Sequence, residues 1–472
     1  MVSSSSVVKN YKNSINKNYL FNIKPSSNGI PSTIKNIGYG IKESRSTPTH
    51  ENIKVHHSSL KIVFPIRPTT DPKLVFPKRI YATKASERVL LKTIAFPINP
   101  SDKNQIDGTY GAFNEKIRLS QKASAFSVAG NEGLYQIQAF LNPNDEVIPD
   151  FVHSQYKVGD VVVPLVGNTG TWCDYKVLPL HAIGNNKQKP YWKVDSQVDL
   201  TPEGTRGFGI LEAATAAVNG CTALGFAELF QKNVFEHIRK HNNKEVENKT
   251  DYYCFTNAGN SQVSKLFAQI VHSDYSYKDY RKIIGDHLKT ISILRERNTP
   301  EETEDFINRI QNESKTDIII TETINQDKEK SKEFMNKFKD QDVNFAMAIN
   351  SVGGSSVSGI ERKLSVDAKV YTYGGMSLKG VVASTTAFIF KNISHLGFWI
   401  TKIFKENETL KIRYLNELAK LYDSKQITLN ADDYEVIEWK VKSDTDEAIL
   451  SKIQEGIQLK GKKPIVYVNH KE

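Results

Sequence analysis

Short apolar runs separated by turns occupy the first part of the chain. Between about residues 60 and 202, the runs 89–96, 133–140 and 158–166 are bounded by glycine and polar residues. Alternation over such short lengths, punctuated by turn residues, predicts β-strands rather than helices. After Gly204 small and apolar residues recur at helical spacing, which predicts tightly packed helices.

A different pattern follows from residue 252 to residue 375. Short apolar runs alternate there with amphipathic helical segments such as 300–314 and 328–340. The apolar runs, each predicted to be a strand, are 252–257, 290–296, 316–322, 344–352 and 368–375. Repeated alternation of strand and helix predicts βαβ units and a doubly wound parallel sheet. The polar stretches 241–249 and 273–287 are interpreted as surface insertions.

The last hundred residues return to the first kind of pattern. An aromatic stretch at 383–404 is followed by an amphipathic helix at 408–425 and a terminal strand at 462–468. We therefore predict an α/β protein in which a β-rich domain contains an inserted doubly wound domain, with the ligand in a cleft between them. The predicted limits are 1–50 for a mitochondrial presequence and disordered tail, 51–225 and 401–472 for the β-rich domain, and 226–400 for the inserted domain.

Composition excludes several classes of protein. The chain has 472 residues, 39% hydrophobic and 25% charged, and no uninterrupted apolar run approaches the ~18 residues that a membrane span needs. Stable membrane insertion is therefore not expected. Three cysteines without a CxxC pair exclude a disulfide scaffold and a cysteine-rich zinc lobe.

Much of the net charge of +10 belongs to the first fifty residues, which hold six Lys and one Arg against Glu43 alone. Val8, Tyr11, Ile15 and Tyr19 recur at helical spacing between lysines, which is typical of a mitochondrial presequence. A disordered basic tail is the alternative interpretation. No cluster of basic and aromatic residues indicates nucleic-acid binding.

The first strand-to-helix turn of the inserted domain has the composition of a phosphate-binding loop. Gly259 follows the strand, while Ala258 and Ser264 stand where glycines often lie. Small residues let the N–H groups at a helix start approach a pyrophosphate. The alternative is an ordinary turn capped by Asn257 or Ser261.

The end of the next predicted strand carries Arg295, Glu296 and Arg297. Nucleotide choice is made at this position, where an acid binds a ribose hydroxyl and an arginine pairs with a 2′-phosphate. Two arginines two apart on a strand project to the same side, so the pattern favours NADPH. A solvated pair of arginines, or an NAD-type contact from Glu296, remains the alternative.

Two glycine pairs follow later strands of the same domain, at 353–354 and 374–375. Backbone without Cβ atoms at the carboxyl ends of parallel strands leaves space for a cofactor. Each pair alone also fits a plain turn, but three small-residue turns at strand ends together favour a nucleotide site.

The chain combines six characteristic sequence blocks. Three lie in the N-terminal half: NPSDKNQIDGTYGAF (99–113), AGNEGLYQI (129–137) and VGDVVVPLVGNTGTW (158–172). Three lie in the later half: INSVGGSSVSGIERKL, YTYGGMS and IFKNISHLGFWITK. This combination resembles the medium-chain dehydrogenase/reductase superfamily and, within it, the mitochondrial 2-enoyl thioester reductases, over about residues 75–470. The resemblance implies a GroES-like catalytic domain and a Rossmann domain that binds NADPH.

Zinc enzymes of that superfamily carry a cysteine and a histidine where this chain reads Pro100-Ser101-Asp102 and Gly130-Asn131-Glu132. Without such ligands a tetrahedral catalytic zinc site is not expected. The resemblance instead implies that Tyr110 is the catalytic residue, as a hydrogen-bond donor to the developing enolate or a proton carrier. Gly111 and Ala112 depart from the Pro and Ser usual in the family, which predicts a looser loop.

The resemblance also implies a set of cofactor-binding residues. They are Asn219, Asn260, Ser261, Gln262, Val263, Arg295, Glu296, Arg297, Tyr373, Gly374, Gly375, Met376, Phe398, Trp399, Ile400 and Lys462. The implied activity is NADPH-dependent reduction of trans-2-enoyl thioesters, carried on acyl carrier protein or CoA, in fatty-acid synthesis of the mitochondrial matrix, by a homodimer. A quinone or alkenal reductase without zinc and a degenerate, non-catalytic paralogue are the alternatives.

Overall fold

The computed structural model describes two compact units. The described residues are 33–40, 53–59, 88–107, 116–117, 126–142, 147–148, 156–165, 167, 170–180, 191–194, 209–241 and 249–470. Unit 1 contains the chain up to Val218 together with 408–415 and 430–472, and unit 2 contains 219–407 and 416–429. The inserted unit thus begins seven residues before the limit expected from the sequence, and part of the helix after residue 407 belongs to it.

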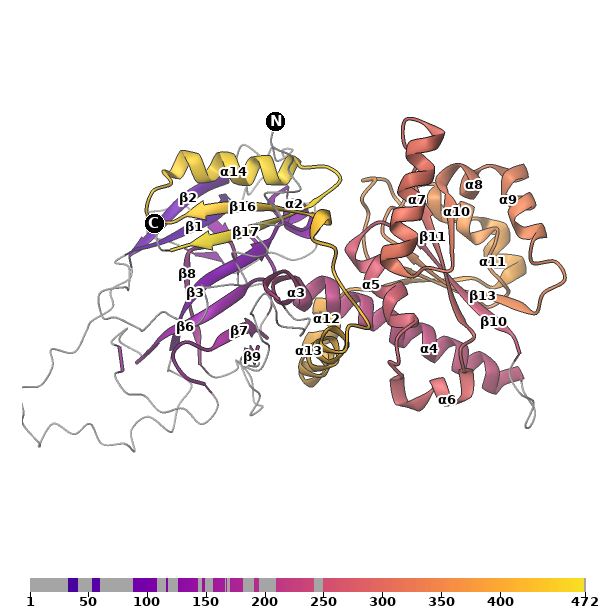
Figure 1. Ribbon diagram of the computed structural model, residues 1–472, viewed down its shortest axis with the longest axis horizontal. Coiled ribbons are helices and arrows are strands. Elements are labelled where there is room, and N and C mark those ends of the chain that lie inside the picture. The colour runs from indigo at the N-terminus through magenta and orange to yellow at the C-terminus, as the bar shows by residue number, and fades with distance from the viewer. Residues whose placement is uncertain are drawn as a thin grey trace, which may run out of the picture. The chain divides into compact units, whose positions relative to one another are not determined.

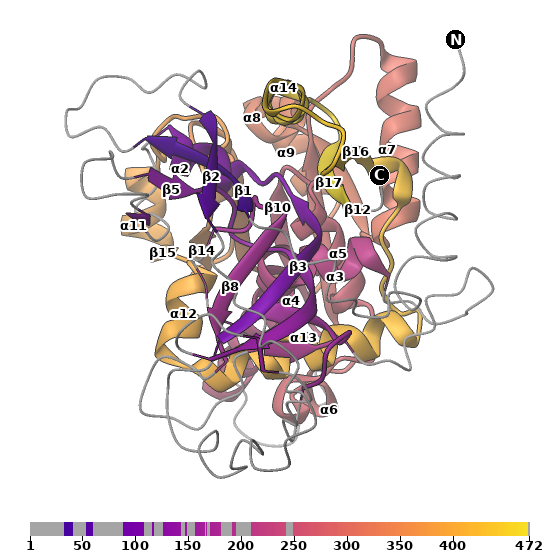
Figure 2. The same cartoon turned by 90° about the vertical axis from the view of Figure 1, so that its left-hand side faces the viewer.

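The larger sheet of unit 1 combines strands from residues 88–193 with the two C-terminal strands. Its strand order is β16-β17-β3-β6-β7-β9, and β8 pairs with β3 alongside (Figure 2). The strands are β3 (Arg88–Pro97), β6 (Leu134–Leu141), β7 (Val161–Pro164), β8 (Tyr175–Pro179), β9 (Tyr191–Lys193), β16 (Tyr434–Lys440) and β17 (Lys463–Asn469). The C-terminal strand β17 pairs antiparallel with β3, so the predicted return of the chain to the β-rich domain is confirmed.

A second sheet of unit 1 has the order β2-β1-β5-β4. Its strands are β1 (Thr33–Gly40), β2 (Ile53–Ser59), β4 (Lys116–Ile117) and β5 (Phe126–Val128). The prediction of a disordered tail over 1–50 is therefore wrong for 33–40, because β1 supplies Ile37, fully buried, to a core that also contains Phe96 and Trp172. The rest of the predicted presequence lies outside the described residues.

The helices in the described part of unit 1 are short apart from α14. They are α2 (Pro100–Ile106), α3 (Ile210–Thr215), α14 (Asp446–Gln458) and the single turn η5 (Ala431–Asp433). Helix α14 packs on β16 (Figure 1) because Ile449, Ile453 and Ile457 recur on one face and are buried. Helix α2 starts at Pro100, where a proline loses no hydrogen bond.

Unit 2 is a doubly wound domain, as predicted. Its six strands are all parallel in the order β12-β11-β10-β13-β14-β15. They are β10 (Asp251–Asn257), β11 (Leu288–Leu294), β12 (Ile318–Thr321), β13 (Val343–Asn350), β14 (Lys369–Thr372) and β15 (Ser394–Gly397). The strand order reverses between β10 and β13, and ligands of such sheets bind at the carboxyl ends beside that point.

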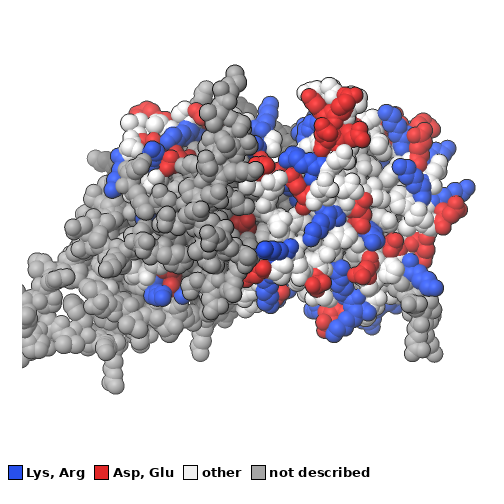
Figure 3. Space-filling model, in the orientation of Figure 1, with Lys and Arg blue, Asp and Glu red and all other residues white. Residues whose placement is uncertain are grey.

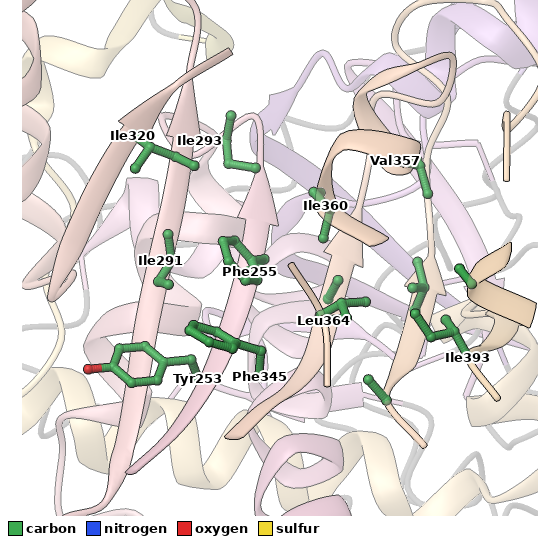
Figure 4. Close-up of a cluster of buried hydrophobic side chains, with 14 of the residues drawn as sticks. Tyr253, Phe255, Ile291, Ile293, Ile320, Phe345, Val357, Ile360, Leu364 and Ile393 are labelled. Carbon is green, nitrogen blue, oxygen red and sulfur yellow. The ribbon is translucent and has the colours of Figure 1, made fainter. Parts of the chain in front are cut away.

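Helices cover this sheet. The described helices of unit 2 are α4 (Cys221–His241), α5 (Gln262–Val271), η4 (Tyr277–Asp279), α6 (Arg281–Ile284), α7 (Pro300–Ser314), α8 (Glu322–Gln326), α9 (Lys328–Asn336), α10 (Ser356–Glu361), α11 (Thr385–Lys391) and α12 (Ile400–Glu406). Helix α13 (Glu408–Asp423) begins in unit 1 and ends in unit 2. Helices α4, α5 and α7 pack side by side, while α9, α10 and α11 contribute Phe334, Ile360 and Ala387 to a core against the strands. Figure 4 shows part of this core, with Ile360 of α10 and the strand residues Phe255 and Ile291 labelled. On the face of unit 2 drawn in Figure 3, basic and acidic side chains are interspersed.

One segment of unit 2 differs from the expectation. The stretch 273–287 is partly core, since Tyr275 and Ile284 are buried and the Tyr275 hydroxyl donates to the Glu228 carboxylate on α4. Among the described residues, the helical stretch Ile210–Lys240 is long and apolar enough to cross a membrane, but 89% of its apolar window is buried within the protein. Such burial is typical of a core helix.

Candidate functional site

Buried amides join the carboxyl ends of β10 and β13, where the strand order reverses. Asn257 Nδ2 donates to Asn350 Oδ1 at 2.8 Å, and the Ser351 backbone N–H donates to Asn257 Oδ1 at 2.7 Å. Asn350 Nδ2 in turn donates to Thr372 Oγ1 on β14 at 3.0 Å. Because buried polar groups are costly unless paired, this network holds three strand ends in one arrangement.

The same network shapes the glycine turn after β13. Asn350 Oδ1 also accepts from the backbone N–H groups of Val352 and Gly353, at 3.2 and 3.0 Å. Gly353 has φ +76°, and a Cβ atom there would lie 2.6 Å from the Lys379 carbonyl oxygen. This position therefore requires glycine, and the turn brings the backbone of the loop after β14 against the end of β13.

The turn after β10 has the features of a phosphate-binding loop. Ala258 adopts φ +52°, and a Cβ atom on Gly259 would lie 2.7 Å from Ser292 Cβ on β11. Ser261 caps α5 by accepting from the Ser264 N–H at 3.2 Å, with Asn260 exposed before it and Gln262 and Val263 in the first turn. The glycine thus permits close strand-to-helix packing, and the helix start presents N–H groups toward an anion.

Asn219 lies in a π-helical turn, η3 (Ala216–Gly220), that precedes α4. Its Nδ2 donates to Gln262 Oε1 at 3.2 Å, so the structure brings it to the predicted phosphate turn. Single π-helical turns occur frequently at functional sites because they rotate a side chain out of the regular helix register.

Arg295, Glu296 and Arg297 follow β11 rather than lying on it, since the strand ends at Leu294. Glu296 Oε1 accepts from the Thr323 backbone N–H at 2.9 Å and so is engaged with α8. Both arginines are exposed. The prediction that the two arginines project to the same side through strand alternation is therefore wrong in its premise, because neither lies on β11.

An aromatic group lines the ends of β14 and β15. Tyr373 shares side-chain hydrogen bonds with Ser261 and Ser351, and burial raises the pKa of its hydroxyl. Phe226 on α4 lies 4.3 Å from Phe398 and 5.2 Å from Tyr373 between ring centroids. The remaining residues predicted here are Gly374, Gly375, Met376, Trp399 and Ile400, which follow β14 or precede and begin α12. The rings are inclined to one another, by 36° between Phe226 and Phe398 and by 63° between Phe226 and Tyr373, so they form an edge-to-face aromatic cluster.

A separate polar network is buried in unit 1, at the positions that hold metal ligands in zinc enzymes. Asn131 Nδ2 donates to Asp102 Oδ1 at 2.6 Å, and Asn99 Nδ2 donates to Glu132 Oε1 at 2.8 Å. Lys463 donates to Asn99 Oδ1. The side chains at these positions are thus engaged with one another.

Burial shifts the pKa values of this network toward the neutral forms. It raises the pKa of Asp102 to about 7, with the nearby Glu132 charge adding to the effect. It also raises the pKa of Glu132 and lowers the pKa of Lys463 to about 8. Glu132 Oε2 accepts from the Val218 N–H at 2.7 Å, so the network also supports the π-helical turn.

Two predicted residues are not brought into either cluster. Tyr110 lies outside the described residues. Lys462 is partly exposed in unit 1, 3.5 Å from Glu435 Oε2, whereas its neighbour Lys463 enters the buried network.

Sequence reasoning missed Asn350 and Phe226, and considered Asn257 only as a cap. An asparagine at the end of each of two predicted strands, before Ala-Gly and before Ser-Val-Gly-Gly, was an available signal for the amide network. No local signal distinguishes Phe226 from other apolar residues of α4.

Comparison with curated proteins decides the family. The chain is 34% identical over 384 residues to the mitochondrial enoyl-[acyl-carrier-protein] reductase of Kluyveromyces lactis, covering 81% of this chain and 86% of that protein. It is 31% identical to the Saccharomyces cerevisiae protein of the same name, covering 90% and 98%. The chain belongs to the mitochondrial enoyl-[acyl-carrier-protein] reductase family. The resemblance predicted from the sequence motifs is therefore confirmed.

Other comparisons define the limits of that assignment. A protein named NADPH quinone oxidoreductase from Kluyveromyces marxianus is 33% identical over 81% of this chain and 86% of its own length. Two solved structures share the fold. The mitochondrial 2-enoyl thioester reductase heterodimer of Candida tropicalis gives a TM-score of 0.64, and a complex of one such reductase with NADP and crotonyl-CoA gives 0.63. Each is 24% identical to this chain, and each comparison covers 92% of this chain and 99% of the other. No protein-family model matches the chain.

Proposed function

We propose that this member of the family reduces trans-2-enoyl thioesters to saturated acyl thioesters with NADPH, in mitochondrial fatty-acid synthesis. The observation that carries the proposal is the joint presence, in a chain of this family, of a phosphate turn at Gly259 and two arginines after β11. The names of the relatives place them in mitochondria, and the acid-poor N-terminal sequence supports the same location for this chain.

The described residues fit NADPH. The α5 start, with Asn260, Ser261, Gln262 and Val263, would hold the pyrophosphate, and Arg295 and Arg297 would hold the 2′-phosphate. The loop 373–376 and the segment 398–400 would contact the nicotinamide, with Asn219 at the phosphate turn. When bound, NADPH supplies the hydride that is added to Cβ of the enoyl group.

Tyr110 is proposed to act on the thioester side of the substrate, at the carbonyl oxygen or at Cα. Its hydroxyl would donate a hydrogen bond to the thioester carbonyl oxygen as negative charge develops there, or pass a proton to Cα. A neutral phenol with an ordinary pKa of ~10 is a weak acid, so stabilising a developing charge suits it better than full proton transfer. Lys462 is proposed as a further cofactor contact. Its neighbour Lys463 is the control position for substitutions, because Lys463 donates to Asn99 in the polar network of unit 1.

Replacement of Tyr110 tests this assignment. Tyr110→Phe removes one oxygen and keeps the ring, so turnover of crotonyl thioester should fall by ~10²–10³, with NADPH affinity and thermal stability nearly unchanged. Single-turnover NADPH oxidation measures the effect. A Phe variant that reacts within about threefold of the wild type contradicts a role for this hydroxyl in the chemistry.

A quinone reductase is the second candidate function, because a relative of equal similarity carries that name. The two activities share the nucleotide site and differ in the acceptor. Purified protein should oxidise NADPH with crotonyl thioester far faster than with a quinone, and the reverse preference would decide for the second candidate. Binding of NADPH without oxidation by either acceptor would indicate a non-catalytic paralogue.

A homodimer through unit 2 is also proposed. Eight large apolar residues exposed by 40–83% gather between residues 376 and 396: Met376, Leu378, Val381, Val382, Phe388, Ile389, Phe390 and Leu396. They lie in the segment that follows β14 and ends in β15, and β15 pairs only with β14 among the described strands. An unpaired sheet edge beside exposed apolar residues favours a protein partner, and a second copy of this chain is the simplest one.

A further inference from the structure

Arg297 lies on the face of an aromatic ring that helix α7 provides. Its guanidinium carbon is 3.6 Å from the centroid of the Phe306 ring, and its backbone N–H donates to Thr303 Oγ1 at 2.9 Å. The N–H donors of a guanidinium lie in its plane, so stacking one face on a ring leaves those donors available. The contact therefore orients the guanidinium without occupying its hydrogen-bonding edge.

Positive charge is concentrated around this ring. Arg309 lies 5.3 Å from the same ring centroid, and burial, followed by the charges of Arg295 and Arg309, lowers the pKa of Arg297. Glu302 acts on Arg297 in the opposite direction, but its Oε2 already accepts from the Asn298 N–H at 3.2 Å.

In the part of the chain that the structure describes, neither Arg295 nor Arg297 forms an ion pair. Arg309 by contrast is paired with Glu313 at 3.6 Å. Neighbouring cations repel one another, and an anion with several oxygens relieves that repulsion by pairing with more than one of them. The arginines follow β11, next to the strand that carries the phosphate turn, which is where an adenosine ribose lies in doubly wound domains.

We propose that Phe306 is the positioning residue that orients Arg297 toward the 2′-phosphate and thereby sets the preference for NADPH over NADH. This inference rests on the proposed nucleotide site but concerns a residue outside it. Phe306 acts through Arg297, because a stacked guanidinium presents its donors in one direction, whereas an unstacked one samples many rotamers and binds phosphate less well.

Nucleotide binding tests the proposal without requiring turnover. The affinities of the full-length protein for NADPH and NADH are measured by fluorescence titration for the wild type, Phe306→Leu, Phe306→Tyr and Arg297→Met. Phe306→Leu should weaken NADPH binding roughly three- to tenfold and change NADH binding by less than about twofold. Phe306→Tyr, which keeps an aromatic face, should retain the wild-type preference. Phe235→Leu, at a phenylalanine of α4 whose ring centroid lies 5.7 Å from the guanidinium carbon of Arg239, is the matched control and should change neither affinity.

The outcomes separate this proposal from the function. Equal weakening of both nucleotides by Phe306→Leu, or failure of Phe306→Tyr to retain the preference, overturns it, since either indicates a structural role. The proposal is also overturned if Arg297→Met loses the preference for NADPH while Phe306→Leu keeps that preference. If Arg297→Met also keeps the preference, the assignment of the arginines fails as well. The enoyl thioester assay on the wild type tests the function separately. If Phe306→Leu does not fold, Phe306→Met takes its place, with the same expected effects.

Discussion

Asp102 is an acid held where water does not reach it. The side chain is fully buried on α2, accepts from the Asn99 N–H at 2.8 Å and from Asn131, and lies near Glu132. Burial disfavours the charged carboxylate, which raises the pKa of Asp102 to about 7 from 3.8. The folded protein therefore keeps a proton that the unfolded chain releases.

This difference predicts a pH dependence of stability. Between about pH 4 and pH 7 the folded state binds one more proton than the unfolded state, so the free energy of unfolding should fall as the pH rises through that interval. In Asp102→Asn the free energy of unfolding should fall less over this interval, by a difference on the order of 2 kcal/mol from the wild type. Urea unfolding at pH 5 and pH 7.5 measures it, with the exposed Asp279→Asn expected to behave as the wild type. Identical pH dependence in Asp102→Asn and the wild type would contradict the prediction.

At the scale of elements, the first described strand is attached to unit 1 by distant partners. The Ile37 N–H donates to the Trp172 carbonyl at 2.9 Å, and the Ala129 N–H donates to the Ile37 carbonyl at 3.0 Å. The Lys35 N–H donates to Asp174 Oδ1 at 2.8 Å. Strand β1 therefore belongs to the folded protein, although it follows directly on the basic N-terminal sequence.

Truncation distinguishes the strand from the sequence before it. Removing residues 1–32 should keep thermal stability and activity while abolishing mitochondrial import, because only the basic segment is lost. Removing residues 1–40 should also lower the melting temperature markedly, since Ile37 is fully buried and loss of such a side chain alone costs ~2–5 kcal/mol. Equal melting temperatures of the two truncated proteins would refute the expectation about β1. Mitochondrial import of the protein that lacks residues 1–32 would refute the expectation about the presequence.

At the scale of the whole molecule, the exposed apolar residues around β15 predict self-association. Leu378 and Phe390 are 83% and 75% exposed, and a charge at each position should prevent burial against a second copy. Analytical ultracentrifugation should give the mass of two chains for the wild type and of one for the Leu378→Glu/Phe390→Glu double variant. Ile283→Glu, at an exposed apolar position on α6, should remain a dimer. A wild-type protein with the mass of one chain would contradict the homodimer. The next experiment would then test for a heterodimer, the assembly found for the Candida tropicalis reductases.

The alternation of strand and helix between residues 252 and 375, the doubly wound domain and the phosphate turn follow from the sequence itself. Strand and helix periodicity reflects which side chains are buried, and the turn after β10 is built from consecutive residues, so both are local properties. Helix α7, for example, has the limits that its spacing predicted, because Thr299 and Pro300 begin it.

Only the tertiary structure decided which distant residues meet. Asn257 and Asn350 are 93 residues apart, and Asn99 and Lys463 are 364 apart, so no local pattern shows that they are partners. The strand at 33–40 likewise exists because β2, β5 and the core of unit 1 pair with it. Its own sequence, TIKNIGYG, is short and mostly polar or glycine, and the strand also needs β5 and the core around Trp172, which lie far along the chain.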